Sequence, residues 1–273
     1  MDRLSPLLDR FPLQAKVFHS GPLCGFSGLY EGDSIGHLHL LRSGRVTVSD
    51  PQQRQRVVDQ PTLLLYPRPY AHRLHAEAAD QAELLCATFD FGAGLGNPLL
   101  RSLPGAVQVP LGQIASLEPA LNLLFDEAFS GRCGRQGALN RLVEYVLILL
   151  LRQAMADHLL QSGLLAGLAE PRLAKAFDAL HRQPQAAWSL ASLAAQAGMS
   201  RARFAEHFRQ VVGQTPLDYL TDWRLSLARQ QLKQGRPLAL IAEAVGYASA
   251  QALSRVFSQR LGQSPRAWLK AQG

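Results

Sequence analysis

The last third of the chain contains one pattern of residues twice. Residues 190–220 and 238–269 align almost position for position, with a single inserted residue between the matched halves. Gly198 matches Gly246, Phe208 matches Phe257, and each copy has a Gly-Gln-x-Pro sequence near its end. Such matches in a fixed order indicate two copies of one supersecondary unit. The duplication therefore requires this region to fold as two similar modules in series.

Each copy is typical of two helices joined by a short turn. Ser189 can cap a first helix, Gly198 can adopt the left-handed conformation that ends it, and Ser200 can cap a second helix. Gly246 and Ser249 hold the corresponding positions in the second copy. Two helices around a tight turn predict a helix-turn-helix, whose second helix usually enters the major groove of DNA.

One continuous helix is predicted between the copies, over Leu217–Gln234. Pro216 opens it and Gly235 closes it. A helix of about 18 residues is roughly 27 Å long, close to the roughly 34 Å of one DNA turn. A single chain could then read two neighbouring segments of the major groove.

Helical geometry predicts which side chains face DNA. If Phe204 and Phe208 face the core of the first copy, and Leu253 and Phe257 that of the second, the opposite sides are free. The candidate DNA-contacting residues are Arg201, Ala202, Arg203, Ala205, Glu206 and Arg209 in the first copy, and Gln251, Ser254, Arg255 and Ser258 in the second.

The two outward faces differ in chemistry. Arg255 suits guanine O6 and N7, and Gln251 suits adenine N6 and N7. In the first copy, the two alanines offer apolar contact to thymine methyls, Glu206 can accept from cytosine N4, and the arginines suit phosphates as well as bases. The alternative for any one of these residues is an exposed surface position that does not contact DNA. We expect the second copy to carry most base readout and the first mainly to fix position on the DNA.

Net charge separates the repeated region from the rest of the chain. From residue 172 onward there are 14 Lys and Arg against 5 Asp and Glu, whereas the first 171 residues hold 14 against 16. The positive charge thus belongs to the repeated part. A basic module beside a nearly neutral one suggests one part that binds a polyanion and one with a different task.

The first 110 or so residues are typical of β-structure. Short apolar stretches at 37–41, 45–48, 62–66 and 84–91 alternate with turn-forming residues, which suggests a small barrel or sandwich. Helical periodicity follows, with predicted helices at 113–130 and 137–160. The helix at 137–160 carries an apolar stripe that either packs on the barrel or forms a homodimer face. The stripe is formed by Leu139, Leu142, Val143, Val146, Leu147 and Leu150. Residues 163–171 are predicted to be a linker.

Cysteine usage and the apolar runs favour a cytoplasmic protein. Three cysteines without a pairing pattern suit a reducing compartment, and Cys86 is predicted to be a buried strand residue rather than a redox sensor. The N-terminus lacks the apolar core of a signal peptide. The most apolar run, 143–151, is interrupted by Glu144 and is far shorter than the roughly 20 residues of a membrane span.

The repeated region resembles the AraC/XylS family of transcriptional regulators. Residues 188–270 carry the patterns LAxxAGMSRxxFxxxF, GxTPxxYLxxWRLxxA, IAxxVGYxSxxALSRVF and GxSPxxW in the family's order. The resemblance implies a tandem helix-turn-helix domain that activates or represses promoters. The family's base-reading positions agree with the helical geometry, and they fall at Ala202, Ala205, Glu206, Arg209, Gln251 and Arg255.

Residues 37–44 and 65–72 resemble the two conserved strands of a cupin barrel, and residues 83–104 resemble the sensor domain of one branch of the same family. His37, His39 and His72 occupy the histidine positions of metal-dependent cupins, but the family's Glu is absent from residues 40–44. Three imidazoles suit Zn²⁺ or Ni²⁺; alternatively they are buried core or pocket histidines without metal. The residues expected to line an effector pocket are Arg42, Tyr66 and Tyr70.

These observations predict an α+β protein in three parts. A cupin-like effector-sensing β-barrel spans 1–112, a helical linker and dimerisation segment spans 113–171, and an all-α tandem helix-turn-helix domain spans 172–273. The expected function is sequence-specific regulation of transcription, controlled by a small organic molecule or a metal in the barrel. Expected partners are double-stranded DNA, a second copy of the chain and, for an activator, RNA polymerase.

Two other functions compete with this prediction. One is a metal-dependent cupin enzyme fused to a DNA-binding domain, although the absent acidic ligand argues against catalysis. Turnover that is lost in His39→Ala would support this alternative. The other is an architectural DNA-binding protein, which would bind DNA equally well with and without every candidate effector.

Overall fold

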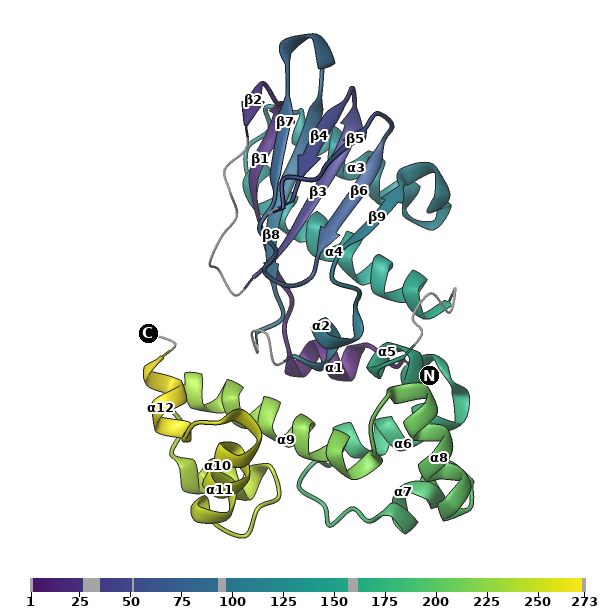
Figure 1. Cartoon of the computed structure of the whole chain (residues 1–273), viewed down its shortest axis with the longest axis vertical. Coiled ribbons are helices and arrows are strands. Elements are labelled where there is room, and N and C mark those ends of the chain that lie inside the picture. The colour runs from purple at the N-terminus through teal and green to yellow at the C-terminus, as the bar shows by residue number, and fades with distance from the viewer. Residues whose placement is uncertain (1, 27–34, 51, 93–96, 157–161, 272–273) are drawn as a thin grey trace. The chain divides into compact units, whose positions relative to one another are not determined.

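The computed structural model describes residues 2–26, 35–50, 52–92, 97–156 and 162–271. The chain forms two compact units (Figure 1). One contains residues 13–95 and 103–157, and the other contains residues 1–12, 96–102 and 158–273. Residues 1–12 and 96–102 therefore belong to the C-terminal unit. Dividing the sequence at one point would not separate the two units.

Two antiparallel sheets form the first unit, as the barrel or sandwich prediction requires. The first sheet has the order β1-β8-β3-β6-β9 and the second β2-β7-β4-β5. The strands of the first sheet are β1 (Gln14–Pro22), β8 (Glu83–Asp90), β3 (Gly36–Ser43), β6 (Thr62–Tyr66) and β9 (Val107–Pro110). Those of the second are β2 (Gly25–Phe26), β7 (Arg73–Ala76), β4 (Val46–Ser49) and β5 (Gln55–Val58).

The central strands β3 and β6 are buried over most of their length. All five residues of β6 and the first six of β3 are buried, including the histidines of β3. Near-continuous apolar runs of this kind are typical of strands that are covered on both faces. The two strands pair with His37 opposite Tyr66 and His39 opposite Leu64, while Cys86 of β8 pairs with His39 from the other side. The predicted histidine strand therefore lies in the middle of the sheet.

The helical segment after the strands lies partly on the edge of this sheet. It contains η3 (Leu111–Gln113), η4 (Ala115–Leu117), α3 (Glu118–Ala128) and α4 (Arg135–Ala156). On α4, Glu144 accepts a hydrogen bond of 3.0 Å from the backbone N–H of Ala15, and Asn140 accepts one of 2.9 Å from that of Val17. Gln136 donates to the Val17 carbonyl at 2.8 Å. These bonds cover the outer strand β1, whose free backbone groups could otherwise pair with another chain.

Helix α4 confirms one of the two alternatives for the apolar stripe. Leu139, Val143, Val146 and Leu147 are buried, so this side of the helix packs within its own unit. Leu142 and Leu150 are only partly buried. The predicted C-terminal end of the helix falls in residues 157–161, outside the described residues. None of the described helices is long and apolar enough to cross a membrane.

The second unit is entirely helical where the structure describes it. Helix-turn-helix pairs α7–α8 and α10–α11 flank the long helix α9, which confirms the interpretation of the duplication (Figure 1). The helices are α1 (Ser5–Arg10), α2 (Pro98–Ser102), α5 (Leu164–Ala169), α6 (Pro171–Arg182), α7 (Leu190–Gln196), α8 (Arg201–Val212), α9 (Pro216–Lys233), α10 (Leu238–Ala244), α11 (Ala250–Leu261) and α12 (Pro265–Lys270).

The predicted caps are present in both copies. Ser200 accepts from the N–H of Arg203 at the start of α8, and Ser249 accepts from that of Ala252 at the start of α11. Gly246 ends the turn after α10 with φ of +86°, and a Cβ there would lie 2.7 Å from the backbone of Gln185. Both the left-handed conformation and this close approach require glycine.

The segment 163–171, predicted to be a linker, contains a packed helix instead. Leu164, Leu165 and Leu168 of α5 are buried. A Cβ at Gly167 would lie 2.4 Å from the Phe177 ring, so α5 rests directly on α6. The leucines form one face of a short helix, and burying that face outweighs the turn-forming tendency of the flanking glycine and proline.

Helix α1 is an unpredicted part of the C-terminal unit. Leu4, Leu7 and Phe11 are buried, and the Phe11 ring meets the Trp223 ring of α9 edge-on at 5.2 Å between centroids. Arg3 donates to the carbonyl oxygens of Leu168 and Ala169 at 2.7 and 3.0 Å. The first dozen residues thus complete the core beneath the first helix-turn-helix.

Candidate nucleic-acid interface and ligand pocket

Helix α8 presents its predicted contact residues away from the core. Phe204 and Phe208 are 0% and 2% exposed and pack inward. Glu206 is exposed and accepts a hydrogen bond of 3.4 Å from Gln210. Ala205 is partly buried. The other exposed members of this face are Arg201, Ala202, Arg203 and Arg209.

Helix α11 has the same arrangement with different side chains. Leu253 and Phe257 are fully buried, while Gln251 and Arg255 are exposed. The two remaining candidates, Ser254 and Ser258, are partly buried at the borders of the outward face. Each recognition helix therefore offers a polar surface opposite its apolar side, as the helical geometry predicts.

The charge on these faces is largely uncompensated. Among the described residues, no carboxylate lies within ion-pair distance of Arg201, Arg203, Arg209 or Arg255. Guanidinium groups without an internal partner are suited to phosphate oxygens or to guanine, both of which accept paired hydrogen bonds. The outward faces are therefore chemically fitted to bind a polyanion.

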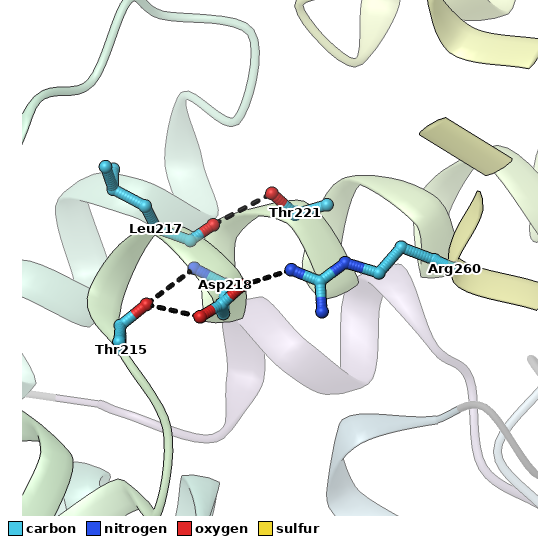
Figure 2. Close-up of polar contacts among 5 residues, drawn as sticks. All are labelled: Thr215, Leu217, Asp218, Thr221 and Arg260. Atoms are coloured by element: carbon cyan, nitrogen blue, oxygen red, sulfur yellow. Dashed lines mark hydrogen bonds and ion pairs between the residues drawn. The ribbon is translucent and has the colours of Figure 1, made fainter. Parts of the chain in front are cut away.

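Arg260, near the end of α11, was not among the predicted contact residues and lies in a different place. Its guanidinium donates to the carboxylate of Asp218, in the first turn of α9 (Figure 2). Thr215, the N-cap of α9, donates to the other Asp218 oxygen at 2.6 Å and accepts from the Asp218 N–H at 3.2 Å. The Thr215 hydroxyl and then Arg260 hold the pKa of the Asp218 carboxyl below its usual range.

This contact joins the second recognition helix to the start of the connecting helix. Of the three residues in this contact, only Thr215 and Asp218 could be predicted from the sequence. The spacing of Thr215 and Asp218 is that of a capping pair at a helix start, which local rules can detect. The partner Arg260 lies on a different helix, and nothing local indicates that it folds back onto α9.

In the first unit, the three predicted histidines are brought together and buried. His37, His39 and His72 are 4%, 0% and 0% exposed. Nε2 of His39 lies 2.7 Å from Nε2 of His72, within hydrogen-bond distance, and Nδ1 of His72 lies 2.6 Å from the Tyr70 carbonyl oxygen. Burial lowers the pKa of His39 well below its usual value and that of His72 to about 4. The rings of His39 and His72 are therefore neutral near pH 7.

This arrangement does not fit the expected metal site. Two imidazole nitrogens bound to one tetrahedral Zn²⁺ stand about 3.3 Å apart with the ion between them. Nε2 of His39 and Nε2 of His72 instead face each other at hydrogen-bond distance. Within the described ranges, no group of three His, Cys, Asp or Glu side chains has an arrangement that could hold a metal ion. His39 and His72 form a hydrogen-bonded pair in the core, so we assign no role to a metal.

A pocket of about 310 Å³ lies beside this cluster in the first unit. Tyr66 and Tyr70, two of the three residues predicted for an effector pocket, line it, together with Arg54 and Arg56. Arg42 is elsewhere. It pairs with Glu83 at 3.2 Å and lies over the Phe129 ring at 4.6 Å.

Cys86 is buried in the same unit, as predicted. It is 3% exposed on β8, and burial raises the pKa of its thiol far above the usual value. Because the thiolate is the reactive form, this cysteine is chemically inert in the folded state.

Comparison with known proteins agrees with this two-part organisation. The family profile described as Cupin matches residues 2–156, and the one described as Helix-turn-helix domain matches residues 193–271. A putative AraC-like transcription regulator of Streptomyces antibioticus is 37% identical over 198 residues. The aligned region is 70% of this chain and spans 64% of that relative's length.

Two further comparisons extend over most of the chain. The RCS-specific HTH-type transcriptional activator RclR of Escherichia coli strain K12 is 30% identical over 237 residues, which are 85% of this chain and 83% of that protein. The crystal structure of ToxT from Vibrio cholerae O395 aligns with 94% of this chain and 96% of its own, at 11% identity and a TM-score of 0.41.

Proposed function

Because the chain belongs to the family of AraC-like transcriptional regulators, with a cupin domain before a helix-turn-helix domain, we propose that it binds promoter DNA sequence-specifically and controls transcription. The observation that carries this proposal is the pair of outward faces on α8 and α11. Each has a buried aromatic or aliphatic side and an exposed outward side. The arginines of these outward sides have no carboxylate partner among the described residues; they are Arg201, Arg203, Arg209 and Arg255. Two recognition helices on one connecting helix suit two successive major-groove segments.

The DNA-binding proposal is tested by selection from a randomised double-stranded DNA library. The full-length protein should enrich a site with two short conserved boxes, and fluorescence anisotropy should show at least about 1,000-fold tighter binding to it than to shuffled DNA. Binding without sequence preference would contradict specific regulation and favour an architectural role.

In this proposal the cupin domain senses an effector and carries out no catalytic step. A small organic molecule in the pocket beside Tyr66 and Tyr70 changes the affinity of the protein for DNA. Such a molecule must bind the two states of the protein with different affinity, because otherwise it shifts no equilibrium. Elemental analysis and native mass spectrometry of the purified protein would identify an organic ligand, whereas a stoichiometric metal would favour the metal-binding interpretation of the three histidines.

The proposal also includes a homodimer in the cytoplasm and, if the protein activates transcription, contact with RNA polymerase. The dimer surface is the side of α4 that its own unit leaves open, where Tyr145 is 47% exposed and Leu142 is partly buried. Tyr145→Glu should convert a dimer to a monomer in analytical ultracentrifugation. Asp59→Lys, which reverses a charge at an exposed position of the same unit outside α4, is the control and should leave the dimer intact.

A further inference from the structure

The pocket of the first unit is built from strands of both sheets. Its walls come from β4, the following turn, β5 and β6, with Ala106 immediately before β9. Strands β5 and β9 are the last strands of their sheets, so the pocket lies where the sandwich has an outer edge. Its volume of about 310 Å³ is at the small end of the roughly 300–1,000 Å³ usual for small-molecule sites. A ligand with a single ring and a short substituent matches that size.

Charge in the pocket is unevenly compensated. Arg54 donates to the Asp50 carboxylate at 2.7 Å, so these two charges offset each other. Arg56 donates to the Tyr66 hydroxyl at 3.4 Å, and no carboxylate of the described residues lies within ion-pair distance of it. The pocket therefore keeps one positive charge that an incoming anion can satisfy. A guanidinium binds a carboxylate through two parallel hydrogen bonds.

One wall of the pocket is flat and aromatic. The Tyr66 and Tyr70 rings are stacked, with centroids 5.3 Å apart and planes inclined by 4°. The His72 ring also stacks on Tyr66, with centroids 4.1 Å apart. Burial raises the pKa of the Tyr66 phenol, which keeps it neutral and able to donate a hydrogen bond. Offset stacking on such a surface favours a planar ring over a saturated one.

We propose that this pocket binds a small organic anion with a planar aromatic ring, whose carboxylate lies on Arg56 and the Tyr66 hydroxyl and whose ring packs against Tyr70. A single uncompensated cation selects a singly charged group over a phosphate ester, and the aromatic wall selects the ring. This inference rests on the proposed function, since it names the chemical class of the effector.

The test uses three probes that separate charge from ring: benzoate, benzyl alcohol and cyclohexanecarboxylate. Isothermal titration calorimetry on the full-length protein should show benzoate binding about tenfold or more tightly than either other compound, because benzyl alcohol lacks the charge and cyclohexanecarboxylate lacks the planar ring. Arg56→Gln should weaken benzoate binding about tenfold or more and leave benzyl alcohol unchanged. Tyr70→Leu should reduce the preference for benzoate over cyclohexanecarboxylate.

Arg73→Gln is the matched control, because Arg73 is an exposed arginine on β7 that does not line the pocket. It should bind benzoate like the wild type. The ligand class is wrong if benzoate gives no saturable binding, if benzyl alcohol binds equally well, or if Arg56→Gln and Arg73→Gln lose the same affinity.

DNA affinity measured on the same samples separates this inference from the proposed function. Benzoate binding that depends on Arg56 and changes affinity for the selected DNA site supports both. Benzoate binding without any change in DNA affinity supports the pocket and contradicts its regulatory role. Specific DNA binding without benzoate binding overturns the ligand class and leaves the DNA-binding proposal standing.

Discussion

Arg260 donates a hydrogen bond to Asp218 and thereby connects the last turns of α11 to the first turn of α9 (Figure 2). Helix α9 carries the first helix-turn-helix at this end and leads to the second. The ion pair therefore restrains the second recognition helix relative to the first. We therefore expect this ion pair to influence which separation between two major-groove segments the protein accepts.

Asp218→Asn should relax this preference for spacing. The amide keeps an oxygen for the Thr215 hydroxyl but removes the charge that holds Arg260. Exposed ion pairs contribute about 0–1 kcal/mol, so the variant should lose little stability. The affinity penalty for inserting or deleting one base pair between the two boxes should fall roughly two- to fivefold in anisotropy measurements.

Arg236→Gln is the control for Asp218→Asn and for a matching Arg260→Gln variant, because it removes a cation just after α9 that pairs only with Gln231 among the described residues. It should retain the wild-type spacing profile. Identical profiles in the wild type and in Asp218→Asn would show that the ion pair does not determine the spacing.

Arg255 should read one base rather than hold the phosphate backbone. Because it is exposed on α11 without a carboxylate partner in the described chain, we expect Arg255→Ala to lose about 1–3 kcal/mol at one position of the site and to relax preference there. Arg203→Ala, at an exposed position outside the base-reading set, should instead weaken all sequences alike and reduce the dependence of affinity on salt. The measurement is binding to a library that varies each base in turn. A uniform loss in Arg255→Ala would assign this residue to phosphate.

The helix-turn-helix copies could be predicted in detail because their signals are local. Ser200 and Ser249 cap the recognition helices, and Gly246 takes the positive φ that ends the preceding turn. Each of these features depends on a few neighbouring residues. The periodicity of Phe204 and Phe208 then sets the outward face without any knowledge of the tertiary structure.

What could not be predicted depends on contacts between distant residues. Arg42 was expected in the pocket, but it pairs with Glu83 on a neighbouring strand. Arg56 does line the pocket, yet in the sequence it is only an exposed residue of a short strand. Helix α1 is too short to be stable alone. Its position in the fold is fixed by the packing of the Phe11 ring against the Trp223 ring. No local pattern carries that information.

Phe11→Ala should therefore destabilise the C-terminal unit, although Phe11 lies at the other end of the chain. The ring is 0% exposed and packs on Trp223, so its removal should cost about 3–5 kcal/mol. All three tryptophans of the chain, Trp188, Trp223 and Trp268, belong to this unit, so their fluorescence during urea unfolding reports on it.

Asp9→Ala is the control, because Asp9 is an exposed residue of α1 and should change stability by less than about 0.5 kcal/mol. A chain that begins at residue 13, and therefore lacks α1, should unfold at lower urea concentration than the full chain. Equal midpoints for Phe11→Ala and the wild type would show that α1 contributes nothing to the core of this unit.

His181 should make the C-terminal unit sensitive to acid. It is 2% exposed, its Nε2 lies 2.7 Å from the Tyr219 hydroxyl, and burial lowers its pKa to about 3. An unfolded histidine has a pKa of about 6.5, so between these values the unfolded state binds the proton and the folded state does not. The contribution of the neutral ring to stability is complete above pH 6.5 and is lost progressively as the pH falls toward 3.

At pH 5 this loss amounts to about 2 kcal/mol relative to pH 7.5. His181→Gln keeps a polar side chain that can pair with the Tyr219 hydroxyl but cannot titrate. It should be less stable than the wild type at pH 7.5 because it packs less well against Trp223, whose ring lies 4.0 Å from that of His181. Its stability should nevertheless fall by about 2 kcal/mol less between pH 7.5 and 5, as measured by tryptophan fluorescence in urea. Parallel pH profiles for the two proteins would mean that His181 is not the group responsible.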